Sequence, residues 1–506
     1  MGQSVFGTGI ARICAVVAAP RARQFCALVR QALEETPTVE LRLDWLENDR
    51  ERHKALNWLK RFKPKRAAFV ATCRRRVGGG ELTGGAAEEL FWLRKAKEAG
   101  CAWCDLEIET FRELPAKVVE GYALPPKVML SIHDFRGTPK LSEGLDIPAA
   151  AGVTAVKMAA MSRNLSDAAR LLRQVRGAKD LVAVPMGEIG LPARILSLRE
   201  GSALAYAPVA AATAPGQVPL HDLKKLYRAH QLTHKTRVYG VIGDPIGHSL
   251  SPLLHNTGYV AARKDAVFLP FLVENLREFL KALVDFGVKG FSVTLPHKQS
   301  ILKYLAECEP LAAQIGAVNT VTVGRDGKLA GSNTDYVGVL RALEGKLQLS
   351  GSRVVILGAG GAARAAAFAV AKAGGEVLVC ARRETAAKEL ASAVHGGVLR
   401  RAALRKHTFD ALVNATPVGM HPHSSDAPLK ADELKGSLVL DLIYRPLETK
   451  LLRAAAARGM RTVSGVEMFL EQGMAQWEFW MGSAAPESAM RQAVVGALKA
   501  ETAARP

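Results

Sequence analysis

Between residues 12 and 228, eight short apolar runs alternate with amphipathic segments. A chain that repeats strand and helix in this way buries its strands in a parallel sheet, and eight such units predict a closed (β/α)8 barrel. The expected strands span 13–18, 39–44, 68–73, 102–108, 128–133, 155–158, 181–185 and 203–207, and the clearest helices span 86–99 and 165–175.

The strand expected at 155–158 carries one lysine, Lys157, among apolar residues on both faces. Such a strand belongs in the interior of a sheet, where a charged amine is costly unless it is paired. A neutral amine in that position is a nucleophile for ketones and can form a Schiff base. Taken alone, Lys157 fits equally well a side chain at a strand end that extends to water.

Other polar residues gather where the expected strands end, which is where barrels of this kind hold their active sites. They are Glu40 and Arg42 on the second strand, Arg74 after the third, His133 on the fifth, Glu188 and Arg194 after the seventh, and Thr213 and Gln217 after the eighth. Each has a bland explanation, such as a buried Glu40–Arg42 ion pair or a hydrogen-bonded core histidine. Burying all of them without a ligand would cost several kcal/mol per group, so a binding site is expected at this end.

Several segments of the first half resemble type I 3-dehydroquinate dehydratase. The motifs are V-E-L-R-L-D at 39–44, S-I-H-D-F at 131–135, V-K-M at 156–158, M-G-E-I-G at 186–190 and A-P-G-Q at 214–217. The resemblance implies that Lys157 forms a Schiff base with the substrate ketone while His133 moves the protons. It also implies a set of residues that hold the substrate carboxylate and hydroxyls: Glu40, Arg42, Arg74, Arg194, Thr213 and Gln217.

One position departs from the dehydratase pattern. The resemblance implies a glutamate just before a Gly-Gly pair in the loop after Arg74, and that glutamate orients the catalytic histidine. Here the loop reads R-R-R-V-G-G-G-E at 74–81, so Gly78 stands in place of the acid. Either Glu81 reaches in from the loop, or His133 relies on another partner.

Residues 221–237 read as a closing helix followed by a short polar linker, which places the boundary of the first half near 232–236. The expected domains are a barrel over 1–232, a substrate-binding α/β lobe over 237–345 completed by 466–506, and a Rossmann-type lobe over 346–465. The substrate is expected between the last two lobes, with hinge closure on binding.

A strand, a glycine turn and an alanine-rich helix follow one another over 353–364. Gly358 permits a tight turn, and Gly360 and Gly361 let the backbone approach a pyrophosphate at the helix N-terminus. The next strand, 376–380, is followed by Arg382 and Arg383, where an NAD site would place an acid. Two arginines suit a 2′-phosphate, so NADP(H) is expected.

The second half resembles shikimate dehydrogenase, through S-L-S at 249–251, T-L-P-H-K at 294–298, N-T-D at 333–335, N-A-T-P-V-G-M at 414–420 and D-L-I-Y-R-P at 441–446. The resemblance implies Lys298 and Asp335 as the catalytic pair. It implies a set that binds the hydroxylated ring: Ser249, Ser251, Thr294, Asn319, Tyr444 and Gln472. The cofactor set is Gly358, Ala359, Gly360, Gly361, Ala362, Arg382, Thr416 and Gly465. The resemblance implies N-R-T at 381–383, where this chain has A-R-R.

The two resemblances name consecutive reactions, so the sequence predicts a bifunctional enzyme that dehydrates 3-dehydroquinate and reduces 3-dehydroshikimate to shikimate, without a metal. Two alternatives stay open: a dehydrogenase half that acts on quinate, and a barrel impaired by Gly78. Nucleic-acid binding could explain the net charge of +20, but the basic residues are widely spread. Neither a signal peptide nor a membrane span is expected, and a cytoplasmic location follows.

Overall fold

The computed structural model describes residues 12–64, 66–139, 153–178, 180–210, 216–421 and 423–503. The chain forms two compact units, and it passes from the first to the second between Thr236 and Arg237. The first unit also includes Phe271–Gly287, and the second consists of Arg237–Pro270 and the chain from Val288 onward. No helix in the described ranges has both the length and the apolar character needed to cross a bilayer.

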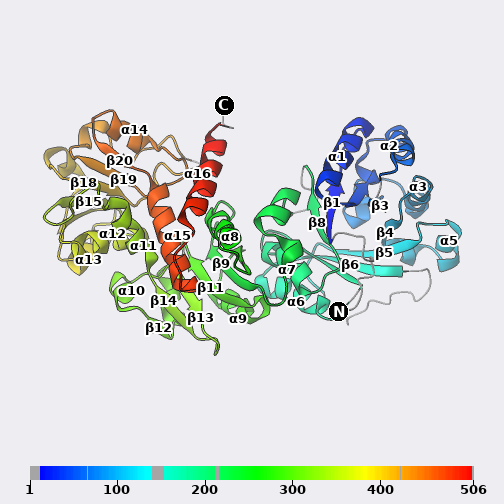
Figure 1. The fold of residues 1–506 in the computed structure, drawn as a ribbon, viewed down its shortest axis with the longest axis horizontal. Coiled ribbons are helices and arrows are strands. Elements are labelled where there is room, and N and C mark those ends of the chain that lie inside the picture. Colours follow the sequence, from blue (N-terminus) through cyan, green and yellow to red (C-terminus); the bar gives the residue numbers. More distant parts are fainter. Residues whose placement is uncertain are drawn as a thin grey trace. The chain divides into compact units, whose positions relative to one another are not determined.

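The first unit contains the predicted barrel (Figure 1). Its eight strands are parallel where they pair, in the order β7-β6-β5-β4-β3-β2-β1-β8. Near the start of β7, the amide of Ala203 donates to the carbonyl of Leu181 at 3.0 Å, so the two ends of the sheet adjoin. The strands are β1 (Ile13–Val17), β2 (Thr38–Arg42), β3 (Ala68–Thr72), β4 (Trp103–Glu107), β5 (Lys127–Asp134), β6 (Val153–Met161), β7 (Leu181–Met186) and β8 (Ala205–Pro208).

Helices alternate with these strands, as the sequence predicts. They are α1 (Ala22–Glu35), α2 (Asp49–Phe62), α3 (Ala86–Glu98), α4 (Ile108–Glu113), α5 (Ala116–Gly121), α6 (Leu165–Val175) and α7 (Leu191–Glu200). The predicted closing helix is instead two short turns, Asp222–Leu226 and Ala229–Gln231. Arg228 between them has a φ of 50°, a left-handed conformation that breaks a helix.

Strand β6 directs Lys157 into the barrel. Ala155 and Ala159 belong to the apolar cluster that includes Val70, Met129 and Tyr206 from other strands. Side chains two residues apart on a strand share a face, so Lys157 lies between these alanines on the inner face. The register pairs Ser131 of β5 with Lys157, and His133 follows two residues later on the same face. The barrel therefore brings the predicted lysine and histidine to the same end of its interior.

The second unit begins with a mixed six-stranded sheet in the order β10-β9-β11-β13-β14-β12. Strands β9 and β11 are parallel, so the turns that follow them lie at the same edge. The elements are β9 (Arg237–Gly243), α8 (Ser251–Ala261), β10 (Ala266–Leu272), α9 (Leu276–Phe286), β11 (Val288–Val293), β12 (Glu307–Cys308), α10 (Pro310–Ile315), β13 (Thr320–Val323), β14 (Leu329–Ser332) and α11 (Thr334–Leu343). Helix α9 is grouped with the first unit, where it packs against α6.

A second six-stranded sheet follows, parallel throughout, in the Rossmann order β17-β16-β15-β18-β19-β20. Its elements are β15 (Arg353–Leu357), α12 (Gly361–Lys372), β16 (Glu376–Cys380), α13 (Glu384–Ala393), β17 (Gly397–Val398), β18 (Ala411–Asn414), β19 (Leu438–Asp441), α14 (Lys450–Ala456) and β20 (Arg461–Val463). The predicted Rossmann-type fold is therefore confirmed.

Two long helices end the chain, α15 (Gly465–Met481) and α16 (Glu487–Ala503). Helix α15 crosses α11 closely at Gly338, where an added Cβ would lie 2.7 Å from the carbonyl oxygen of Met468 and 2.9 Å from the Cβ of Gln472. This crossing holds Gln472 beside the start of α11, the helix that carries Asp335. The domain boundaries predicted within this unit stay predictions.

Candidate functional sites in the barrel and the dehydrogenase unit

Lys157 is buried inside the barrel, with its side chain 5% exposed. Its ammonium pairs with Asp105 of β4 and lies 3.5 Å from Oε1 of Glu40 on β2. Nζ also lies 4.5 Å from the centre of the Tyr206 ring. The structure therefore has the buried, paired lysine rather than a strand-end side chain that extends to water.

Asp105 is an anion fixed in place by its neighbours. Ser131 donates to Oδ1 from its hydroxyl at 2.5 Å, and Arg74 donates to the same oxygen at 3.2 Å. Burial alone would favour the neutral acid, but Lys157 and Arg74 hold the pKa of Asp105 well below its usual range.

The predicted Glu40, Arg42 and Arg74 are all buried, and each has a protein partner. Oε1 of Glu40 accepts from the Thr72 hydroxyl at 2.8 Å. Arg42 forms a bidentate salt bridge with Asp44, with donor–acceptor distances of 3.0 and 2.7 Å. Glu40 and Arg42 therefore do not form the ion pair considered from the sequence. Nε of Arg74 donates to Oε1 of Glu107 at 2.7 Å.

His133 faces an acid that the sequence did not single out. Its Nδ1 lies 3.4 Å from Oε2 of Glu107, the last residue of β4, and the His133 side chain is 6% exposed. Burial and the nearby Arg74 lower the pKa of His133, and Glu107 opposes this shift. Glu81 is exposed and its backbone amide donates to Asp44, so the partner of His133 is Glu107 rather than Glu81.

Arg194 is a buried cation near the end of β7. Nε and Nη2 both donate to the carbonyl of Pro185, at 3.0 and 2.8 Å. Burial lowers the pKa of Arg194 to about 10. Gln217 is half-buried, and Thr213 lies outside the described residues.

In the second unit, Nζ of Lys298 donates to Oδ2 of Asp335 at 2.5 Å. Asp335 also accepts from Nδ2 of Asn319 at 2.8 Å, and the same amide lies 3.4 Å from Oε1 of Gln472. These four predicted residues thus form one connected chain of polar contacts. Gln476, which the sequence did not single out, donates to the carbonyl of Asn319 at 3.2 Å and so helps to hold it.

The remaining predicted ring-binding residues lie on turns of the same unit. The amide of Thr294, directly after β11, donates to the carbonyl of Ile242 on β9 at 3.0 Å. The hydroxyl of Ser249 accepts from the Ser251 amide at 3.2 Å, at the start of α8, whose N-cap residue is Leu250. Burial raises the pKa of Tyr444, whose ring packs on Phe469 with centroids 4.7 Å apart.

The glycine turn after β15 has the features of a dinucleotide site. Gly358 has a φ of 108°, which only glycine adopts easily, and an added Cβ would lie 3.1 Å from the carbonyl oxygen of Ala415. Gly360 is the N-cap of α12, and the space around its Cα is open. At Gly361, an added Cβ would lie 3.4 Å from Cδ of Lys298, so the turn adjoins the Lys298–Asp335 pair.

Other predicted cofactor residues lie around this turn. Arg382 is exposed after β16, the strand beside β15. The Thr416 hydroxyl donates to Oδ1 of Asn414 at 2.7 Å, and Asn414 in turn donates to Asp441 at 2.9 Å. Gly465 begins α15, where an added Cβ would lie 2.5 Å from the carbonyl carbon of Leu442.

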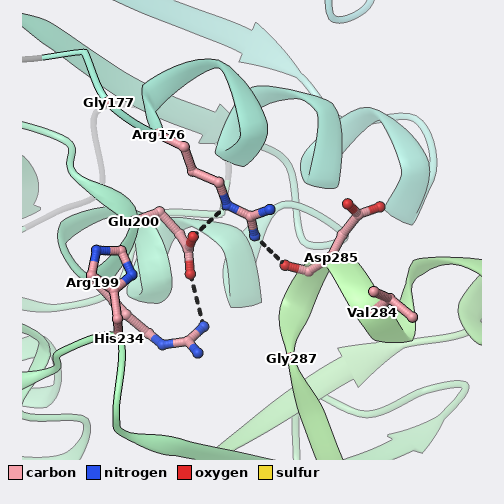
Figure 2. Close-up of a pocket in the computed structure, with 8 residues that line it drawn as sticks. All are labelled: Arg176, Gly177, Arg199, Glu200, His234, Val284, Asp285 and Gly287. Carbon is pink, nitrogen blue, oxygen red and sulfur yellow. Dashed lines mark hydrogen bonds and ion pairs between the residues drawn. The ribbon is translucent and has the colours of Figure 1, made fainter. Parts of the chain in front are cut away.

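A cavity of about 340 Å³ lies elsewhere in the first unit (Figure 2). Its wall includes Glu200 at the end of α7, which accepts from Arg176 at 2.6 Å and from Arg199 at 2.8 Å. Arg176 also donates to the carbonyl of Asp285, at the end of α9, at 2.7 Å. The helices end here, so the cavity lies at the end of the barrel where strands begin, opposite Lys157 and His133.

Asp105 and Glu107 are the main residues that sequence analysis missed in the barrel. A signal was present, because they alternate at the end of β4 just as Glu40 and Arg42 alternate on β2. Gln476 gave no such signal, because it sits among apolar residues of a long helix.

Comparison with known proteins agrees with this division. Residues 13–234 match the family model of type I 3-dehydroquinase. Residues 241–321 match the substrate-binding domain of shikimate dehydrogenase, and residues 465–495 match the C-terminal domain of shikimate 5′-dehydrogenase. A structure of a chorismate mutase/shikimate 5-dehydrogenase fusion from Clostridium acetobutylicum is 30% identical, covers 53% of this chain and 98% of its own, and superimposes with a TM-score of 0.50.

Two relatives cover different lengths of the chain. A Bacillus mycoides shikimate dehydrogenase (NADP(+)) is 44% identical over 271 residues, which are 51% of this chain and 98% of that protein. A chloroplastic bifunctional enzyme of Arabidopsis thaliana is 36% identical over 477 residues, which are 89% of this chain and 78% of that protein. With both halves matched along a single relative, the chain belongs to the bifunctional 3-dehydroquinate dehydratase/shikimate dehydrogenase family.

Proposed function

We propose that the barrel converts 3-dehydroquinate to 3-dehydroshikimate through a Schiff base on Lys157, and that the second unit reduces this product to shikimate with NADPH. The main support is that each half pairs a lysine with acids where its reaction needs one: Lys157 with Asp105 and Glu40, and Lys298 with Asp335.

In the barrel, the amine of Lys157 attacks the substrate ketone and water leaves, which forms an iminium. The iminium draws electrons from the adjacent carbon, so His133 can remove a proton there. His133 then returns that proton to the departing hydroxyl, which leaves as water. Hydrolysis of the imine releases 3-dehydroshikimate and restores Lys157.

The acids around Lys157 favour this route because the iminium carries its positive charge where the ammonium was. Asp105 and Glu40 already face that position and do not need to move as the charge forms. Arg194 is a buried cation that suits the substrate carboxylate, since a guanidinium binds both oxygens of a carboxylate.

In the second unit, Lys298 donates a proton to the carbonyl oxygen of 3-dehydroshikimate, and Asp335 orients the amine through their hydrogen bond. Asn319 holds Asp335 from the other side, Gln472 contacts the Asn319 amide, and both side chains offer amides to the ring hydroxyls. NADPH supplies the hydride when it is bound. The residues that would hold it are the open glycine turn at Gly358–Gly361 and, for the 2′-phosphate, Arg382.

A coupled assay on the full chain tests both steps. We expect NADPH to be consumed when 3-dehydroquinate is supplied. Lys157→Ala should abolish that signal yet leave NADPH consumption with 3-dehydroshikimate intact. Lys298→Ala should instead convert 3-dehydroquinate to 3-dehydroshikimate, which then accumulates. Absence of turnover by the folded wild-type chain with either substrate would contradict the proposal.

Borohydride reduction tests the covalent step directly. With 3-dehydroquinate, the wild-type chain should gain the mass of one reduced adduct, and Lys157→Ala should gain none. Relative rates with shikimate and quinate would decide whether quinate is a second substrate, which Ser249 and Ser251 together argue against. All seven cysteines are unpaired, which fits a reducing compartment, but the cytoplasmic location stays a prediction because the Arabidopsis relative is chloroplastic.

A further inference from the structure

Gly78 leaves a space that a carboxylate from another strand fills. A Cβ added at Gly78 would lie 2.3 Å from Oε2 of Glu107 and 3.0 Å from its carboxyl carbon. Glu107 comes from β4, whereas Gly78 lies in a short turn, Arg76–Gly78, after β3. A side chain at residue 78 and the present position of Glu107 therefore exclude each other.

The two oxygens of Glu107 have different surroundings. Oε1 accepts from Arg74, which anchors the carboxylate. Oε2 has no hydrogen-bond partner among the described residues, and neither has Nδ1 of His133, although both atoms are buried. The two atoms are 3.4 Å apart, so a small rotation of either side chain would close a hydrogen bond between them.

The other acids near His133 are engaged elsewhere. Asp105 is bound by Lys157, Arg74 and Ser131. Glu40 accepts from Thr72 and faces Lys157. Glu107 is thus the acid near His133 that has an oxygen available.

We infer that Glu107 is the positioning residue for His133, replacing from β4 the acid that the loop lacks at Gly78. This inference rests on the dehydratase function proposed above. By accepting from Nδ1–H, Glu107 holds the neutral imidazole in one tautomer and leaves Nε2 as the nitrogen that takes and returns the proton.

Glu107→Gln in the full chain tests this role, because an amide can keep the bond to Arg74 but cannot serve as the anion facing Nδ1. We expect kcat for dehydration to fall at least about 100-fold, with KM little changed. The acid limb of the pH profile of kcat should also move to lower pH, since loss of the anion makes the imidazole easier to deprotonate. Reduction of 3-dehydroshikimate by the same preparation should be unchanged, which reports folding of the chain.

Moving the carboxylate from residue 107 to residue 78 distinguishes the loss of its charge from a packing defect at residue 107. Glu107→Ala should lose activity, and the double variant Gly78→Glu with Glu107→Ala should regain at least about tenfold of it, by general acid–base reasoning. Gly78→Gln with Glu107→Ala has the same size without the charge and should regain none. Residue 78 does not have a positive φ, so a side chain there is not barred by the backbone.

The outcomes separate the two levels of the proposal. If wild type forms no borohydride adduct and shows no dehydration, the dehydratase function itself is wrong. The positioning role of Glu107 is overturned if wild type is active and any of three results is found. These are a kcat of Glu107→Gln within threefold of wild type, an unshifted acid limb in its pH profile, and no gain in activity when Gly78→Glu is added to Glu107→Ala. Glu81→Gln, at an exposed residue, should change the rate less than twofold; a large loss there would favour Glu81 instead.

Discussion

The two lysines proposed to act in catalysis have different surroundings. Lys157 is on a central strand, 5% exposed, between two carboxylates and the face of Tyr206. Lys298 follows a strand by a turn, is 17% exposed, and pairs with Asp335 as its one acid among the described residues. These surroundings suit the roles proposed above. A nucleophile must stay at one point through several steps, as a residue on a strand inside a barrel can, whereas a proton donor has to reach a substrate that enters beside a cofactor, as a residue on a turn can.

The acids near the two lysines also differ in what holds them. Asp105 is bound by Lys157 on β6, by the Ser131 hydroxyl on β5 and by Arg74, which follows β3. Asp335 sits at the start of α11 and is held by the amide of Asn319. Charged side chains therefore dominate the contacts of the barrel site, whereas neutral amides surround a single ion pair in the dehydrogenase site.

Exchange of each lysine for arginine gives the sharpest contrast. Lys157→Arg keeps a positive charge but has no amine to form an imine, so dehydration should fall by about 10³-fold or more. Lys298→Arg keeps a cation near the carbonyl, so the rate of reduction should fall by a smaller factor. The rates of dehydration and of reduction are measured with each substrate supplied separately, and equal losses in the two variants would contradict different roles for the two lysines.

Asp335→Asn tests the single ion pair of the dehydrogenase site. The amide cannot form an ion pair with Lys298 and so orients its ammonium less well, and kcat for reduction should fall by about 100-fold. Dehydration by the same variant should be unaffected, which serves as its control. An unchanged reduction rate would mean that Lys298 works without Asp335.

Arg382→Ala should affect only the second half, because the barrel reaction needs no cofactor. Loss of a charge-assisted contact to the 2′-phosphate should raise KM for NADPH about tenfold and leave that for NADH unchanged. Lys388→Ala, an exposed cation that pairs with Glu384, is the matched control. Equal effects on both cofactors would argue against a phosphate contact.

Among the described residues no cation pairs with Asp441, a buried acid, in contrast to Asp105. Burial raises the pKa of Asp441 from 3.8 to about 6, against hydrogen bonds from Thr449, Ile443 and Asn414. Its contribution to stability is complete below pH 3.8 and is lost as the pH rises through about 6. Between pH 5 and pH 7, wild type should therefore lose about 1 kcal/mol relative to Asp441→Asn. Denaturant unfolding of both proteins measures this, and a constant difference would refute it.

Much of the molecule was readable from the sequence because periodicity and strand-end positions are local properties. Eight alternating units predicted the barrel, and polar residues at strand ends pointed to Lys157, His133 and Glu40. The glycine turn before an alanine-rich helix likewise located the cofactor lobe. The roles assigned to individual residues stay predictions until the variants are measured.

The hydrogen-bond and ion-pair partners of these residues could not be predicted from the sequence in the same way. The sequence indicated that His133 lacked its expected acid but left Glu81 and other residues as candidates. It also left open an ion pair between Glu40 and Arg42, whereas each has a different partner. Such contacts join residues far apart in the chain, and they depend on which strands become neighbours in the sheet, which the local pattern of a single strand does not record.

By itself, the sequence determined the two fold classes and the lysine on the sixth barrel strand, because each is recorded in a local pattern, while the two consecutive reactions and Lys298 followed from its resemblance to known families. Only the tertiary structure decided that β4 supplies both Asp105, which pairs with Lys157, and Glu107, which faces His133. The physical reason is that closing the barrel brings the ends of β4, β5 and β6 together in register, and the absent side chain at Gly78 leaves room for the carboxylate of Glu107.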